Sequence, residues 1–286
     1  MESNLKKFSG LGVFTLLVLN GIVWFWILTP QPLSQTEIYF LDVGQGDSAL
    51  IMLSGGAKIL IDGGPINGRA LRNLEPILPF SDRYIDLVQV THPQQDHYGG
   101  LIEILKYYQV GAVLTDGQTS KNASWQEFER VVAEKKIPVI VMNAGDGIQY
   151  RDSKLDVLSP MIGETAKDIN DLGIVMRVTS GDLKALFTAD ISAAKEKELA
   201  RKFDLDVDIL KVSHHGSKYS SDIQFLREAT PAISVIGVGK NSYGHPTAQT
   251  LDRLASIDSL VYRTDKDGVL KARISDGQLR ISHLKE

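Results

Sequence analysis

The residues best suited to chemistry lie in the segment 91–100, where two histidines and a carboxylate fall within six positions. His92, Asp96 and His97 offer nitrogen and oxygen ligands that are close enough in the chain to bind one divalent cation or a pair. The apolar run 87–90 before them is predicted to be a buried strand. The segment therefore predicts a metal site on a strand-to-helix loop, as in a metal-dependent hydrolase.

Further candidate ligands follow other predicted strands. Asp62 ends the run 58–62 and begins a Gly-Gly turn, and Asp190 ends another apolar run. Loops at the carboxyl ends of strands are where α/β proteins usually build their sites. Both residues also have structural interpretations. Asp62 could accept turn hydrogen bonds, or hold a ligand without binding metal itself, and Asp190 could be the N-cap of a helix that begins at Ala193.

The remaining candidates are histidines. His214 and His215 follow the apolar run 209–212, and His245 precedes a predicted helix that has Pro246 in its first turn. The adjacent pair could instead be a surface pair with one ring in the core, and His245 could belong to a turn only. The combination of a dense ligand loop with an aspartate and a histidine cluster at strand ends favours the metal site.

Composition limits the class of protein. The chain has 286 residues, 43% of them hydrophobic and 23% charged, with a net charge of −4 and no cysteine. The absence of cysteine excludes thiolate zinc sites, cysteine nucleophiles and a disulfide-linked partner. The acidic balance argues against strong nonspecific DNA binding. A local basic set could still border the site or form a solvated face: Lys195, Lys197, Arg201, Lys202, Lys211 and Lys218.

The first thirty residues are predicted to be a separate unit. Lys6 and Lys7 precede the uncharged stretch 11–28, which has Trp24 and Trp26 near its far end. This length spans a bilayer as a helix, and the lysines place the N-terminus in the cytoplasm. We therefore expect a single-pass cell-membrane anchor with the rest of the chain on the extracytoplasmic side. The alternative is a cleaved signal peptide and a secreted protein.

The rest of the chain predicts a short linker, residues 31–36, and one hydrolase domain, residues 37–286. Strands are predicted at 38–42, 48–53, 58–62, 86–91, 112–114, 139–142, 155–158, 174–179, 184–188, 208–212, 232–236, 260–262, 270–274 and 279–281. Helices are predicted at 101–108, 124–136 (with Ser124 as its N-cap), 193–203 and 246–254. This order predicts an α/β fold with two mixed sheets and helices outside them, a four-layer αββα sandwich.

Six motifs resemble those of the metallo-β-lactamase superfamily. Within it, the chain is similar to the extracellular hydrolase domain of the ComEC family of DNA-uptake competence proteins. The motifs are Leu-Asp-Val-Gly-Gln-Gly-Asp-Ser (41–48), Asp-Gly-Gly (62–64), Thr-His-Pro-x-x-Asp-His-x-Gly-Gly (91–100), Thr-Ala-Asp (188–190), Lys-Val-x-His-His-Gly-Ser (211–217) and Tyr-Gly-His-Pro (243–246). The resemblance covers residues 37–286 and implies the metallo-β-lactamase fold.

The resemblance also implies roles for individual residues. His92, Asp96 and His97 are expected to bind one or two divalent metal ions, and Asp190 is expected to be the bridging carboxylate. A ligand set without thiolate suits zinc or manganese. Such ions generate a hydroxide nucleophile near neutral pH, and Asp96 could hold it in line for attack.

The last two motifs carry the other expected roles. One of His214 and His215 is expected to supply a further ligand, and the sequence leaves open which. His245 is expected to be either a ligand or a proton donor to the leaving group. Two residues depart from the family pattern. Gln94 stands where the superfamily has His and competence relatives usually have Asp, and Ala189 replaces a usual Gly.

Three functions follow. The first is a membrane-anchored phosphodiesterase or nuclease outside the cytoplasmic membrane, acting on single-stranded DNA or another phosphodiester. The second is a hydrolase of a different envelope phosphodiester, ester or lactam, since the fold hosts several chemistries. The third is a non-catalytic binding module whose metal site is degenerate because the amide of Gln94 is a poor ligand.

Overall fold

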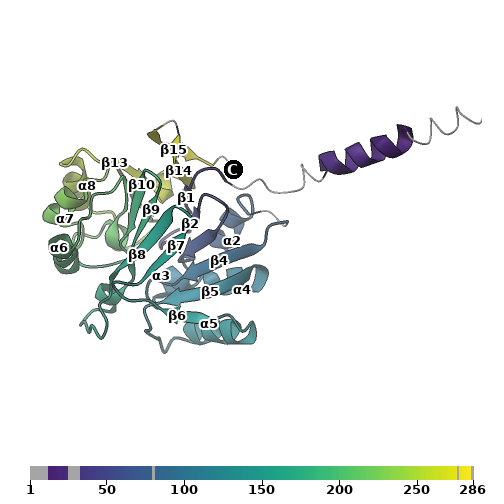
Figure 1. Cartoon of the computed structure of the whole chain (residues 1–286). Coiled ribbons are helices and arrows are strands. Elements are labelled where there is room, and N and C mark those ends of the chain that lie inside the picture. The colour runs from purple at the N-terminus through teal and green to yellow at the C-terminus, as the bar shows by residue number, and fades with distance from the viewer. Residues whose placement is uncertain (1–11, 25–32, 79–80, 276, 285–286) are drawn as a thin grey trace, which may run out of the picture. The chain divides into compact units, whose positions relative to one another are not determined.

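A computed structural model describes residues 12–24, 33–78, 81–275 and 277–284 of the chain (Figure 1). The chain divides into two units, Met1–Leu33 and Ser34–Glu286. Residues 12–24 of the first unit are helical and exposed. Within the described ranges, no helix is both long and apolar enough to cross a membrane. The expected span 11–28 runs beyond the described residues at both ends, so the anchor stays a prediction.

The second unit is built on two mixed sheets. Its first sheet has eight strands within the described residues, ordered β15, β14, β1, β2, β3, β4, β5 and β6. These strands are β1 (Glu37–Phe40), β2 (Ala49–Met52), β3 (Lys58–Ile61), β4 (Tyr84–Gln89), β5 (Gln109–Thr115), β6 (Val139–Val141), β14 (Leu270–Ser275) and β15 (Gln278–His283).

The second sheet has seven strands in the described part of the chain, ordered β13, β12, β11, β10, β9, β8 and β7. They are β7 (Gly147–Tyr150), β8 (Ser153–Ser159), β9 (Val175–Ser180), β10 (Leu183–Phe187), β11 (Ile209–Lys211), β12 (Ile233–Ile236) and β13 (Leu260–Arg263). The α-helices of this unit are α2 (Arg69–Leu74), α3 (Gln95–Tyr98), α4 (Leu101–Tyr107), α5 (Ala123–Glu134), α6 (Ala193–Lys202), α7 (Ile223–Ala229), α8 (Ala248–Ala255) and α9 (Thr264–Asp267). Two 3-10 turns are η1 (Ile169–Leu172) and η2 (Ser213–Gly216).

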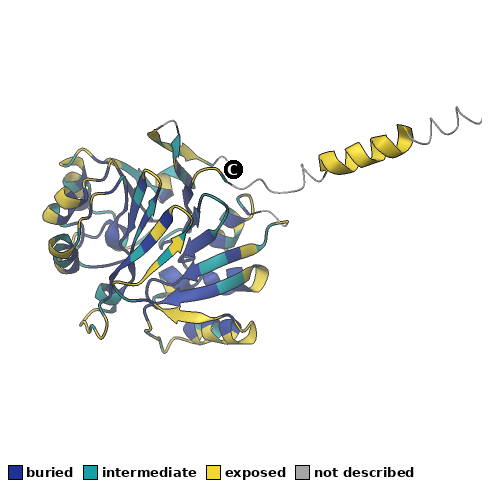
Figure 2. Ribbon diagram, in the orientation of Figure 1, coloured by how far each residue is buried: buried dark blue, intermediate teal, exposed yellow. Residues whose placement is uncertain are grey.

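Three hydrophobic clusters define the layers (Figure 2). One packs α2, α4 and α5 on the outer face of the first sheet, a second lies between the sheets, and a third packs α6, α7 and α8 on the second sheet. In β10, Ala185 and Phe187 join the middle cluster whereas Leu186 joins the outer one. Both faces of the strand are thus buried from Ala185 to Phe187, which explains why this part of its sequence is continuously apolar. The predicted four-layer sandwich is confirmed.

Two predicted helix starts are wrong. The N-cap position of α5 is Asn122, and Ser124 lies inside the helix, where its hydroxyl shares a 2.7 Å hydrogen bond with the hydroxyl of buried Tyr98. The N-cap of α8 is Thr247, whose side chain accepts a hydrogen bond from the backbone N–H of Thr250. Pro246 therefore precedes the helix instead of forming its first turn. A side chain that can satisfy a free N–H fixes this start more strongly than a proline does.

Candidate metal centre

The candidate ligands lie on loops at the carboxyl ends of strands. Strands β1, β3 and β4 run in the same direction, so the loops that carry Asp47, Asp62 and His97 share one edge of the first sheet. In the second sheet β10 and β11 are parallel, and Asp190 and His215 follow them. The two sets meet, because Asp190 Oδ2 lies 3.3 Å from His97 Nε2.

Glycines let the loops of the first sheet touch through their backbones. The N–H of Gly63 donates to the carbonyl of His97 at 2.6 Å, and that of Gly100 donates to Gly64 at 2.8 Å. A Cβ atom on Gly100 would lie 2.0 Å from the carbonyl oxygen of Gly63. Any side chain at Gly100 would therefore push the two loops apart. The paired glycines fix His97 against the Asp62 turn.

Four buried side chains form the centre. Asp47, His97, Asp190 and His215 each offer one ligand atom, and these atoms all lie within 4.8 Å of one another. Asp190 Oδ2 is the common point of the two histidines, at 3.3 Å from His97 Nε2 and 3.4 Å from His215 Nε2. Ligand atoms about 2 Å from a tetrahedral cation lie about 3.3 Å apart. The distances from Asp190 to the two histidines therefore suit a shared cation.

The hydrogen bonding of these side chains also fits a cation. Buried atoms without a hydrogen-bond partner include His97 Nε2, His215 Nε2, Asp190 Oδ1 and Asp47 Oδ1. An unsatisfied buried polar atom costs about 1–3 kcal/mol, so a folded protein rarely gathers several in one place without a reason. A divalent cation would satisfy them together. Imidazole and carboxylate ligands without thiolate suit zinc or manganese.

Asp62 holds His97 in place. Asp62 Oδ2 lies 2.8 Å from His97 Nδ1 and accepts a hydrogen bond from the Thr91 hydroxyl at 2.7 Å. Asp62 Oδ1 accepts from the backbone N–H of Thr91 at 2.8 Å. An ionised carboxylate only accepts, so Nδ1 donates its proton to Asp62, and Nε2 is the ring nitrogen left to bind a cation. Asp62 thus has the geometry of a residue that orients a ligand.

His92 and Asp96 flank the four-residue cluster. The His92 ring lies 4.1 Å from the His97 ring, centroid to centroid, and its buried Nε2 has no hydrogen-bond partner. Asp96 Oδ2 lies 3.5 Å from His215 Nε2. Both side chains are within reach of a second cation or of a wider coordination sphere. Their roles as ligands stay predictions.

The adjacent histidines take different positions. His215 Nδ1 lies 2.7 Å from the carbonyl oxygen of Gly237, which leaves Nε2 for the cluster. His214 is 33% exposed at its side chain, and its Nε2 is 4.0 Å from Asp190 Oδ2. Both residues have left-handed backbones, with φ of 49° and 52°. The geometry therefore favours His215 as the buried ligand and leaves His214 facing the cleft.

Asp190 does not cap α6, because Ser192 holds the N-cap position and its side chain accepts from the N–H of Lys195. The turn before Asp190 has its own strain. Ala189 has a φ of 48°, in the left-handed region that glycine adopts more readily. The turn directs the Asp190 carboxylate to the common point of the cluster.

Asp47 is the site residue that the sequence did not predict. Its carboxylate forms a close ion pair with buried Lys211 and lies 3.4 Å from His215 Nδ1. The signal that could have identified it is its place in a glycine turn at a strand end, like Asp62. Lys211, assigned from the sequence to a basic set, belongs to this centre instead.

The charged groups of the centre shift one another's pKa values. Burial opposes ionisation of His97, but Asp190 and Asp62 outweigh it and hold the pKa of His97 well above its usual value. Against the same effect of burial, Asp190 and Asp47 raise the pKa of His215 to about 10. A cation must therefore displace protons from these rings when it binds.

The side chain of Gln94 makes a hydrogen bond between two loops and does not serve as a metal ligand in this arrangement. Its side-chain amide donates a 2.6 Å hydrogen bond to the Oδ1 of Asn170, a buried residue of η1. The bond ties the metal-ligand loop of the first sheet to a loop of the second. The amide at this position thus serves as a link between loops, whereas a carboxylate would offer a ligand.

A cleft of about 520 Å³ opens beside the centre. Asp96, Asp190, His214 and His215 line it, and His245 lies across it, with its ring 5.7 Å from that of His214. Burial and the two neighbouring histidines lower the pKa of His245. The neutral ring suits a ligand or a hydrogen-bond acceptor at neutral pH, and a proton donor only in acid.

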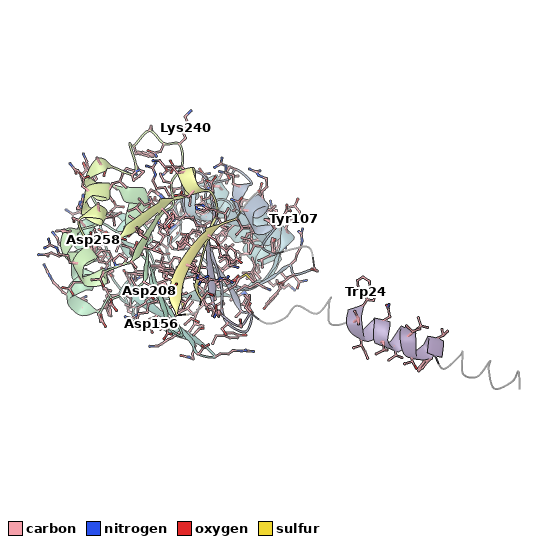
Figure 3. All side chains as sticks on the ribbon, turned by 90° about the horizontal axis from the view of Figure 1, so that it is seen from above. Trp24, Tyr107, Asp156, Asp208, Lys240 and Asp258 are labelled. Carbon is pink, nitrogen blue, oxygen red and sulfur yellow. The ribbon has the colours of Figure 1, made fainter. Side chains whose placement is uncertain are left out.

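No lysine or arginine is among the described residues that line this cleft. Lys195, Lys197 and Lys202 of α6 pair with carboxylates elsewhere, as in the 3.2 Å contact of Lys197 with Asp222. Lys240, on a loop near the cleft, points away from the body of the domain (Figure 3). None of the predicted basic set is among the described residues that line the cleft, and its three α6 lysines are paired with neighbouring acids.

Comparison with known proteins agrees with this geometry. A family model described as the metallo-beta-lactamase superfamily matches residues 41–240. ComE operon protein 3 of Bacillus subtilis is 28% identical over 287 residues, covering 90% of this chain and 36% of that protein. Competence protein ComA of Neisseria gonorrhoeae is 26% identical over 288 residues, covering 98% and 38%. The similarity to competence proteins is confirmed, and the chain spans less than two fifths of either relative.

A solved structure has the same architecture. The metallo-beta-lactamase fold protein YhfI from Bacillus subtilis aligns with a TM-score of 0.58 at 13% identity, covering 83% of this chain and 99% of that one. At this identity the likeness concerns the fold alone. The arrangement of two sheets with outer helices is thus common to both chains.

Proposed function

The chain belongs to the metallo-beta-lactamase superfamily, and from this premise we propose that it is a membrane-anchored phosphodiesterase that cleaves nucleic acid outside the cytoplasmic membrane. The observation that carries the proposal is the convergence of unpaired, buried ligand atoms on Asp190 at the floor of an open cleft. Similarity to competence proteins supports a nucleic-acid substrate. The uncharged stretch 11–28 supports the anchor.

Asp47, His97, Asp190 and His215 would hold one zinc or manganese ion, with His92 and Asp96 beside them for a second. Such an ion lowers the pKa of bound water toward neutrality and offsets the charge that develops on a phosphoryl oxygen. The remaining chemistry belongs to the chain. Because His215 and His97 outweigh burial and lower the pKa of Asp96 to about 2, this carboxylate stays ionised. It can accept a hydrogen bond from the attacking water and orient it.

Two histidines face the substrate. His214 and His245 lie on the cleft, away from the buried ligands, and their rings are 5.7 Å apart. Either ring can donate a hydrogen bond to a phosphoryl or leaving oxygen. The lowered pKa of His245 makes proton donation from this residue strongest in mildly acidic solution.

The test is to measure bound metal and cleavage on the same sample. The full chain, purified in detergent without chelator, is expected to hold one or two equivalents of zinc or manganese by mass spectrometry and to cleave a single-stranded oligonucleotide. Chelator should remove both properties. The matched control is His283→Ala, because His283 lies on β15, is not among the cleft-lining residues, and its Nδ1 lies 2.9 Å from the backbone carbonyl oxygen of Asp267 on α9. Protein that binds no metal even after zinc or manganese is added would contradict the proposed enzymatic function.

A metal-binding module without catalysis is the second candidate, and the engagement of Gln94 by Asn170 favours it. If this candidate is correct, the native chain binds metal but cleaves no phosphodiester, ester or lactam. Gln94→Asp would then raise metal content or start cleavage. Cleavage by the native chain would exclude it.

A further inference from the structure

Aromatic rings form a row from the buried centre to the surface. The centroid distances between neighbours are 4.1 Å (His92 to His97), 5.6 Å (His97 to His215), 6.2 Å (His215 to His214), 5.7 Å (His214 to His245) and 5.7 Å (His245 to Tyr243). Burial falls along the row, from the fully buried His92 to Tyr243, which is 74% exposed. The outer end is thus an aromatic ring at the mouth of the cleft.

Tyr243 is presented by a loop that Asn241 holds in place. The side-chain amide of Asn241 donates to the carbonyls of Gly239 and His245, both at 2.8 Å. Its oxygen accepts from the N–H groups of Tyr243 at 3.1 Å and His245 at 3.0 Å. The backbone is therefore organised before any ligand binds, which reduces the entropy lost on binding.

The rest of the cleft offers amides in place of cationic side chains. Gln45, Gln94 and Gln95 line it beside the exposed carboxylate of Asp168, and its described lining includes neither lysine nor arginine. Phosphate groups can therefore be met only by the metal centre and by hydrogen bonds from His214 and His245. Affinity for the remainder of a substrate must come from stacking and from hydrogen bonds to neutral groups.

Building on the proposed function, we propose that Tyr243 is the platform on which an unpaired base next to the scissile phosphodiester stacks, so that the substrate class is single-stranded nucleic acid. Tyr243 is tilted by 32° from His245, and its high exposure leaves the ring open to a flat partner. Stacking of this kind accepts any base. A duplex keeps its bases stacked on one another and presents mainly phosphates, for which the described residues of the cleft wall offer no lysine or arginine.

The experiment measures equilibrium binding to the metal-loaded full chain with 2-aminopurine oligonucleotides, whose fluorescence reports stacking, together with KM and kcat for cleavage. Tyr243→Ala is expected to weaken binding about 5- to 100-fold, with a change in KM larger than that in kcat. Tyr243→Phe keeps the ring and should stay within about twofold of the native chain. Tyr219→Ala is the matched control, since Tyr219 is 69% exposed but is not among the cleft-lining residues.

A second substrate separates stacking from charge. An oligonucleotide with abasic positions keeps every phosphate, so the native chain should bind it as weakly as Tyr243→Ala does, and the variant should lose nothing further. If Tyr243→Ala weakened binding to both oligonucleotides equally, or to neither, the inference would be wrong. Cleavage by the native chain would still support the proposed function in that case. Conversely, a native chain that binds by stacking but cleaves no oligonucleotide would contradict the proposed phosphodiesterase function and leave the stacking role of Tyr243 intact.

Discussion

Two loops, one from each sheet, supply a pair of histidines each, but they hold them differently. In the 91–97 loop both His92 and His97 are fully buried, and a carboxylate fixes His97. In the 213–217 loop only His215 is buried, and a backbone carbonyl fixes it. The first loop is built to hold its rings rigidly. The second combines a buried ring with His214, which faces substrate.

Each loop is also held by a buried carboxylate. One of the two carboxylates contacts a candidate ligand directly, and the other contacts only the residues that flank one. Asp62 contacts the ring of His97 directly. Glu196, on α6, accepts hydrogen bonds from the Ser213 hydroxyl at 2.6 Å and from the N–H groups of Ser221 and Asp222 at 2.9 and 2.7 Å. Glu196 thus holds the flanks of its loop. Removing the Glu196 carboxylate should therefore lower metal affinity less than removing that of Asp62.

The largest effect should come from the buried rings. His97→Ala removes a ligand atom that no neighbour replaces, so bound metal and cleavage are both expected to fall below detection. His214→Ala removes only a cleft-facing ring and is expected to keep the metal while lowering kcat about 100-fold. Metal content and single-turnover cleavage of the two variants test the contrast. Equal loss of metal in both would mean that the two loops are not specialised.

The loops themselves were predictable, whereas their internal division of roles was not. Apolar runs followed by Asp or His located the strand ends, because strands covered on both faces read as continuous apolar sequence. The choice between His214 and His215 depends on their left-handed backbones, which sequence pattern does not encode. Asp47 reaches the centre because its N–H bonds the carbonyl of Asp96 at 3.2 Å across two loops. Contacts of this kind are tertiary.

Asp62→Asn should have an intermediate effect. An amide can donate to His97 Nδ1 and so shift the ring proton to Nε2, where it competes with the cation. Metal affinity is expected to fall about 10- to 100-fold, measured by competition with a chelator of known affinity. Asp42→Asn is the control, since Asp42 makes a partly exposed ion pair with Arg69. Unchanged affinity in Asp62→Asn would show that the ring needs no carboxylate to orient it.

Glu196→Gln should have the smallest effect on metal affinity, less than about tenfold. Its main effect should be on how the free energy of unfolding depends on pH. Burial raises the pKa of Glu196 from 4.5 to about 7, despite the hydrogen bond from Ser213. Between these two pH values the folded chain holds a proton that the unfolded chain has lost, so stability falls as pH rises through this window. The whole fall is worth about 3 kcal/mol.

The variant has no carboxyl group to ionise, so this part of the pH dependence should disappear. Urea unfolding of the metal-free chain and of Glu196→Gln, compared from pH 4.5 to pH 8, isolates the contribution because other titrating groups act equally in both. The difference in unfolding free energy should shift in favour of the variant as pH rises, whatever constant cost the amide adds beside the Asp222 N–H. Parallel curves would mean that Glu196 is not held protonated, and that the second loop rests on an ionised carboxylate, as the first does on Asp62.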